Sequence, residues 1–89
     1  MGNDEFLRIC KSKVAEYFNA HADKSKGSTA PMIVNDVYVV WSCKILQNNK
    51  ALLSTNVPDG MYYELTYNGD TNELYFDAYK KWDNVCHKM

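Results

Sequence analysis

The chain has 89 residues, of which 46% are hydrophobic, 24% are charged and 13% are aromatic, and its formal net charge is −1. This composition excludes a disordered chain and predicts a single globular domain over residues 1–89 with a thin core. The near-neutral charge argues against broad binding to nucleic acid or to an anionic membrane, because both need clustered Lys and Arg side chains.

The cysteines and the first residues point to a reducing compartment. Cys10, Cys43 and Cys86 are odd in number and widely spaced, unlike the cysteine framework of a secreted protein. The opening residues, MGNDEF, lack the basic and apolar regions of a signal peptide. No stretch approaches the ~18 apolar residues of a membrane span. We therefore expect a cytoplasmic protein with no membrane association.

The first predicted element is a helix over about 4–22. Phe6, Cys10, Val14 and Phe18 recur at four-residue steps, and the lysines lie largely off that stripe. Residues 23–31, DKSKGSTAP, are small and polar, and they predict a loop between helix and sheet.

Residues from about 36 to 80 change to a period of two, which predicts an antiparallel sheet of four strands. In the first strand, Val39, Trp41 and Cys43 are expected to share a face with Ile45. Asn48-Asn49 suits a two-residue hairpin loop, because Asn tolerates positive φ. The second strand is then expected over 51–57, and residues 58–60 (PDG) form the next turn.

The third and fourth strands are expected over 61–67 and 73–80, joined by a four-residue turn at 68–71 (NGDT). This turn would pair Leu65 with Leu74 and Tyr63 with Phe76, which keeps the two apolar sets on one face. Residues 81–89 form a C-terminal tail that fits either a short helical turn or an extended segment. The predicted fold class is α+β, with the N-terminal helix packed on one face of a four-stranded antiparallel β-meander.

The segments VYVVWSCKILQNNKALLST and DGMYYELTYNGDTNELYFDAYKKW carry a resemblance that runs over nearly the whole chain. In them the chain resembles a family of small uncharacterised proteins encoded by phages and prophages of Gram-positive bacteria. The resemblance implies a phage accessory protein made in the bacterial host cytoplasm. It implies no catalytic or binding residue, because that family has no assigned activity.

Candidate chemistry is sparse. Cys43 lies in mid-strand between large apolar residues, so we expect it to fill the core rather than to act as a nucleophile. Cys86 and His87 are adjacent and would diverge on a helix or a strand, so they make a poor catalytic pair. A zinc site would need ligands from the three cysteines, His21 and His87, whose spacing does not fit. The sequence predicts no enzyme, no cofactor and no metal.

The tyrosines are more informative, because alternation places Tyr62, Tyr75 and Tyr79 on the sheet face opposite the helix. Three readings stay open. The tyrosines are ordinary half-exposed strand residues, an interaction surface for an unknown host or phage protein, or a platform that stacks the bases of single-stranded nucleic acid. The missing basic groove disfavours nucleic acid. The thin core and the uncovered face also predict a homodimer.

Overall fold

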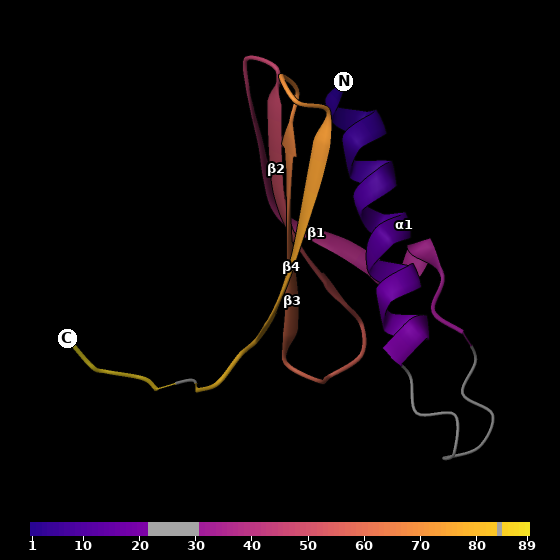
Figure 1. The fold of residues 1–89 in the computed structure, drawn as a ribbon. Coiled ribbons are helices and arrows are strands. Elements are labelled where there is room, and N and C mark those ends of the chain that lie inside the picture. Colours follow the sequence, from indigo (N-terminus) through magenta and orange to yellow (C-terminus); the bar gives the residue numbers. More distant parts are fainter. Residues whose placement is uncertain (22–30, 84) are drawn as a thin grey trace.

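The computed structural model describes residues 1–21, 31–83 and 85–89. Over these residues it contains the elements α1 (Asn3–His21), the short 3₁₀ helix η2 (Val34–Asp36), β1 (Val37–Ile45), β2 (Asn48–Thr55), β3 (Met61–Asn68) and β4 (Glu73–Lys80). The strands form one antiparallel sheet in the order β1-β2-β3-β4, and α1 packs along one side of it (Figure 1). The predicted α+β meander is confirmed. The predicted loop 23–31 lies outside the described residues except for Pro31.

The core lies between α1 and the sheet, and it uses the predicted helix stripe. Phe6, Cys10 and Val14 are fully buried on α1. The inner sheet face meets them with Val37, Ala51, Leu53, Tyr63 and Leu65. Towards the end of α1, the Tyr17 ring packs against Phe76 with centroids 5.1 Å apart, and a T-shaped contact joins it to Tyr63 at 5.8 Å. Aromatic side chains therefore fill the part of the core that lies beside the C-terminal end of α1.

Two polar side chains fix the segment that leads into β1. Asn19 near the end of α1 donates from Nδ2 to the Met32 carbonyl (3.0 Å) and accepts from the Met32 amide at Oδ1 (2.8 Å). Asp36 then accepts from the Asn56 side-chain amide (3.1 Å). These bonds hold the entry to the sheet against the helix and against the end of β2.

The main departure from the predicted pattern is a β-bulge in β1. Val39 pairs with Leu53 but Trp41 pairs with the next residue, Leu52, so Val40 has no partner in β2. An extra residue reverses which face every later side chain occupies. The expectation that Cys43 fills the core is therefore wrong, because Cys43 is exposed. Trp41 and Ile45 are 42% and 66% exposed for the same reason.

The first hairpin turn also differs from the prediction. Asn48 and Asn49 belong to β2, and the turn is formed by Leu46 and Gln47, with Leu46 at φ 56°. This turn packs against the β3–β4 turn. Asn48 Oδ1 accepts a hydrogen bond from the Gly69 amide (3.1 Å), and Gln47 Nε2 donates to Asp70 Oδ1. Contacts between two turns distant in the sequence therefore override the local preference of Asn for the loop.

The β3–β4 register keeps the predicted faces but not the predicted pairs. Leu65 lies opposite Phe76 and Tyr63 lies opposite Ala78, a two-residue shift from the expected pairing. An even shift leaves each side chain on its face, since side chains alternate with a period of two. Beyond β4, the described residues 81–83 and 85–89 form no helix or strand, so the short helical turn is not observed there.

Candidate functional site

The sheet face that α1 does not cover gathers most of the large exposed strand side chains. The strand registers place a continuous set on it, which we call the open face: Trp41, Cys43, Lys50, Leu52, Tyr62, Glu64, Thr66, Tyr75, Asp77 and Tyr79. Figure 1 shows α1 on one side of the sheet and no described helix or strand over the other. The exposed rings of Trp41, Tyr75 and Tyr79 make this face the candidate site that we consider first.

The three tyrosines predicted as an interaction surface all lie on the open face. Tyr62 and Tyr79 are direct cross-strand partners, and Tyr75 stands opposite Thr66 in the same ladder. Tyr75 and Tyr79 are 52% and 50% exposed, while Tyr62 is half-buried. Tyrosines of this kind offer large contact area with only two side-chain torsions to fix.

Sequence reasoning missed the contribution of β1 to this face. The bulge sets Trp41 opposite Leu52 and Cys43 opposite Lys50, which extends the aromatic surface from β4 across to the other edge of the sheet. Nothing in the sequence signals this, because Val40 is an ordinary strand residue and the bulge lacks the Gly that marks one common type.

The centre of the open face is acidic. Glu64 and Asp77 lie directly opposite each other, and Lys50 approaches Glu64 with its Nζ 3.3 Å from Oε1. Asp77 is exposed and forms no ion pair within the described part of the chain. The face therefore offers a carboxylate pair, only partly neutralised, surrounded by aromatic rings.

The thiols and imidazoles are dispersed. Cys10 is fully buried in α1, and burial raises the pKa of its thiol to about 12, so it stays protonated at neutral pH. Cys43 is on the open face, whereas His21 is on α1, where its ring stacks on Tyr17 with centroids 4.0 Å apart. Cys86 and His87 are exposed in the tail. The described residues include no cluster of three or more His, Cys, Asp or Glu placed to hold a metal ion.

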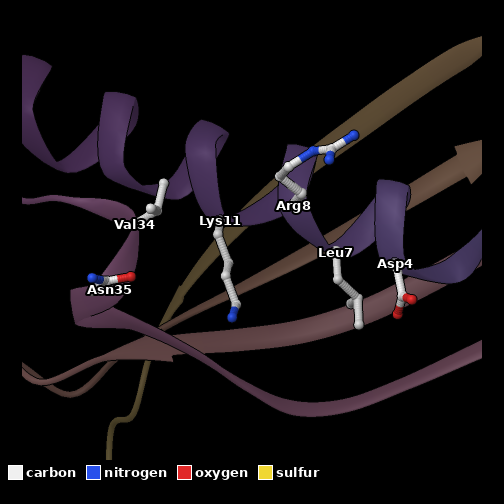
Figure 2. Close-up of a pocket in the computed structure, with 6 residues that line it drawn as sticks. All are labelled: Asp4, Leu7, Arg8, Lys11, Val34 and Asn35. Carbon is white, nitrogen blue, oxygen red and sulfur yellow. The ribbon is translucent and has the colours of Figure 1, made fainter.

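A second surface feature is a hollow of about 360 Å³ between α1 and the η2 segment. It is lined by Asp4, Leu7, Arg8, Lys11, Val34 and Asn35 (Figure 2). Arg8 and Lys11 could together attract an anion, but in Figure 2 their side chains extend in opposite directions. This hollow therefore lacks the converging polar groups of a ligand site, and the open face is the stronger candidate.

The comparisons with known proteins give a family but no activity. Residues 7–89 match the model of a family of unknown function, DUF6275. No curated protein and no solved structure matches the chain. No helix over the described residues is long and apolar enough to cross a membrane. Since the family model covers nearly the whole sequence, the chain belongs to the family of unknown function DUF6275.

Proposed function

We propose that the chain is a non-enzymatic protein-interaction module that binds a protein partner through the open face. The observation that carries this proposal is the direct Tyr62–Tyr79 pair on a sheet face that no described helix or strand covers. Trp41 and Leu52 continue the same surface into β1 and β2. Tyr and Trp side chains are enriched in protein interfaces, where they contribute much of the binding energy.

Two further observations support binding rather than catalysis. The buried Cys10 thiol is protonated at neutral pH, and the exposed Cys43 is separated from His21 by the sheet itself. A thiol nucleophile needs a lowered pKa or an adjacent base. We therefore propose that the chain binds a protein partner rather than catalysing a reaction.

The proposed setting follows from the resemblance to phage and prophage proteins of Gram-positive bacteria. In that setting the chain is an accessory protein acting in the host cytoplasm, and its partner is a host protein or a phage protein, including another copy of itself. The three thiols, none in a disulfide, fit a reducing compartment.

The test is site-specific photo-crosslinking in bacterial cells. A benzophenone side chain replaces Tyr79, which is half exposed and already aromatic, and a matched protein carries the same group at the exposed Arg8 on the helix side. After irradiation, we expect discrete protein adducts from position 79 and none from position 8. Mass spectrometry of the adducts identifies the partner.

Nuclease treatment separates this proposal from the alternative of single-stranded nucleic-acid binding. The alternative has some basis in the exposed rings, which could stack bases. The carboxylates of Glu64 and Asp77 at the centre of the face argue against it, because they repel phosphate. Adducts at position 79 that contain nucleic acid would favour the alternative, and equal adducts from both positions would overturn the proposed surface.

A further inference from the structure

The C-terminal arm, residues 81–89, carries large apolar side chains that the rest of the protein does not cover. Trp82 is 93% exposed, Val85 is 62% exposed and Met89 is fully exposed. Figure 1 shows residues 81–83 and 85–89 of this segment extending away from both the sheet and α1. Single exposed apolar residues are common. Three of them in one short segment suggest that the segment binds to an apolar surface that a single chain does not provide.

The arm is directed away from its own open face. The backbone amide of Lys81 donates to the Gly60 carbonyl (2.6 Å), which continues the β3–β4 ladder by one residue beyond Lys80 and Met61. The chain therefore leaves the end of the sheet along the direction of β4. The open face of a second copy can receive the arm in this extended conformation, without a reversal of the chain.

The charges of the arm and of the open face are complementary. The arm contains Lys81 and Lys88, and Lys80 precedes it at the end of β4, against a single acidic residue, Asp83. The open face presents the Glu64–Asp77 pair, of which Lys50 contacts only Glu64. A lysine of the incoming arm next to Asp77 would supply the missing cation.

The size of the surface is also sufficient. A large aromatic side chain such as Trp82 buries about 200 Å² when it is fully covered. Reciprocal exchange between two copies repeats every contact, because a two-fold interface is self-complementary. Two arms and two open faces together offer enough large side chains to approach the ~800 Å² per partner of a standard interface.

We propose that the open face binds the C-terminal arm of a second copy, forming a two-fold homodimer by reciprocal exchange. Trp82 of one copy packs on the aromatic surface around Tyr62, Tyr79 and Trp41 of the other. This inference rests on the proposed function, since it names the protein that occupies the open face. Self-association then completes the layer that the sheet lacks in a single chain.

The experiment measures mass by sedimentation and light scattering on the purified full chain over a concentration series. The wild-type chain is expected to be a dimer. Trp82→Ala removes the main arm contact and Tyr79→Ser weakens the face, and each should raise the dissociation constant at least about 30-fold. The control, Arg8→Ala on the helix side, should leave it unchanged. Circular dichroism checks that each variant is folded, which is expected because all three side chains are exposed.

Mixing the two weakened variants distinguishes arm exchange from other dimers. The Trp82→Ala chain keeps an intact face and the Tyr79→Ser chain keeps an intact arm, so one good contact can form between them. We expect a heterodimer at a concentration where each variant alone is monomeric. A dimer that survives Trp82→Ala, or a mixture that stays monomeric, would overturn the arm exchange.

Failure of this inference is distinguishable from failure of the proposed function. A wild-type chain that stays monomeric to about 1 mM overturns the homodimer. Adducts from position 79 to a different protein would then still support the open face as a binding surface. A dimer accompanied by adducts only from position 8 would overturn both.

Discussion

Glu64 and Asp77 lie directly opposite each other across the β3–β4 ladder, at the centre of the face that α1 leaves open. Two like charges in this position destabilise a sheet. Lys50 offsets one of them, with its Nζ 3.3 Å from Glu64 Oε1. A fold that carries such a pair beside Tyr62 and Tyr79 sacrifices some stability of the single chain, which is consistent with a surface kept for binding.

Removing one of these charges should stabilise the single chain. In a Trp82→Ala background, chosen to limit dimerisation, Asp77→Asn should raise the free energy of unfolding by a few tenths of a kcal/mol, about 0.2–0.5. Lys50→Gln is the matched change on the same face and should lower it, because both carboxylates then lack a cation. Urea titrations at low salt measure both effects. A stability gain that persists in 1 M NaCl would argue against charge repulsion as its cause.

The sequence predicted the elements, the buried stripe of α1 and the inner faces of β3 and β4, because the periodicities there are strong. Phe6, Cys10, Val14 and Tyr17 recur at steps of four and three residues, which indicates a helix, and the alternation of Tyr63 and Leu65 indicates a strand. The Tyr62–Tyr79 surface followed from the same alternation. The predictable part of the fold is therefore the part that depends on local spacing.

The remaining errors arise where tertiary contacts override spacing. The bulge at Val40 reverses the faces of Trp41 and Cys43, and no residue type marks it. The turn at Leu46 is set by the neighbouring β3–β4 turn rather than by its own sequence. Trp41 and Cys43, two of the ten residues of the open face, were missed for the first reason, since one unpaired residue changes the face of every later position in its strand.

Thiol labelling tests the bulge directly. Cys43 and Cys86 are exposed and Cys10 is buried in the single chain, so in a Trp82→Ala background, which limits the proposed dimer, an aromatic disulfide reagent at pH 8 should react rapidly with two thiols per chain. The third should appear only on the timescale of unfolding, or at once in denaturant. Cys43→Ser should remove one rapid equivalent. If only one thiol reacts rapidly in this background, Cys43 is in the core and the bulge is wrong.

Burial of Cys10 should make the fold sensitive to alkali. Burial raises the pKa of the Cys10 thiol from its ordinary value of 9.0 to about 12, because it disfavours the thiolate. Between these values the unfolded state loses a proton that the native state keeps. The free energy of unfolding therefore falls as the pH rises, by at most ~1.4 kcal/mol per pH unit.

Cys10→Ala should be less stable at pH 7 but should lose stability less steeply between pH 9 and 10.5. Cys43→Ala is the control and should keep the wild-type slope. Tyr63, whose pKa is also raised by burial first and then by Asp59 and Tyr17, is present in all three proteins and cancels in the comparison. Equal slopes for wild type and Cys10→Ala would contradict the buried thiol.

The contact between the two hairpin turns should tolerate no side chain at Gly69. A methyl group added there would overlap the carbonyl oxygen and side chain of Gln47. Gly69→Ala should therefore separate the turns, break the Gly69–Asn48 hydrogen bond and lower the free energy of unfolding by about 2 kcal/mol. Gly2→Ala is the control, because nothing lies within 4 Å of its added methyl group. Urea unfolding that places both variants near wild type would show that the turns are not in contact.

Two adjacent amides in β2 should respond in opposite ways to the same substitution. Asn49 is 1% exposed, and neither its Oδ1 nor its Nδ2 has a hydrogen-bond partner among the described residues, whereas Asn48 Oδ1 accepts from the Gly69 amide. Leucine has a shape close to that of asparagine and no polar atoms in its side chain. Asn49→Leu should therefore raise the free energy of unfolding by about 1–2 kcal/mol, because it removes a buried amide whose lost hydration is not replaced by a hydrogen bond.

Asn48→Leu should instead lower the free energy of unfolding by about 1 kcal/mol, because it leaves the Gly69 amide without its acceptor. Thermal denaturation resolves both changes, since 1 kcal/mol shifts the Tm of a domain of this size by roughly 4–8 °C. A lower Tm for Asn49→Leu would mean that ordered water satisfies the Asn49 amide in solution. A decrease in Tm for Asn48→Leu and an increase for Asn49→Leu would support the start of β2 as the structure has it. Asn48 then contacts the β3–β4 turn, and Asn49 is buried.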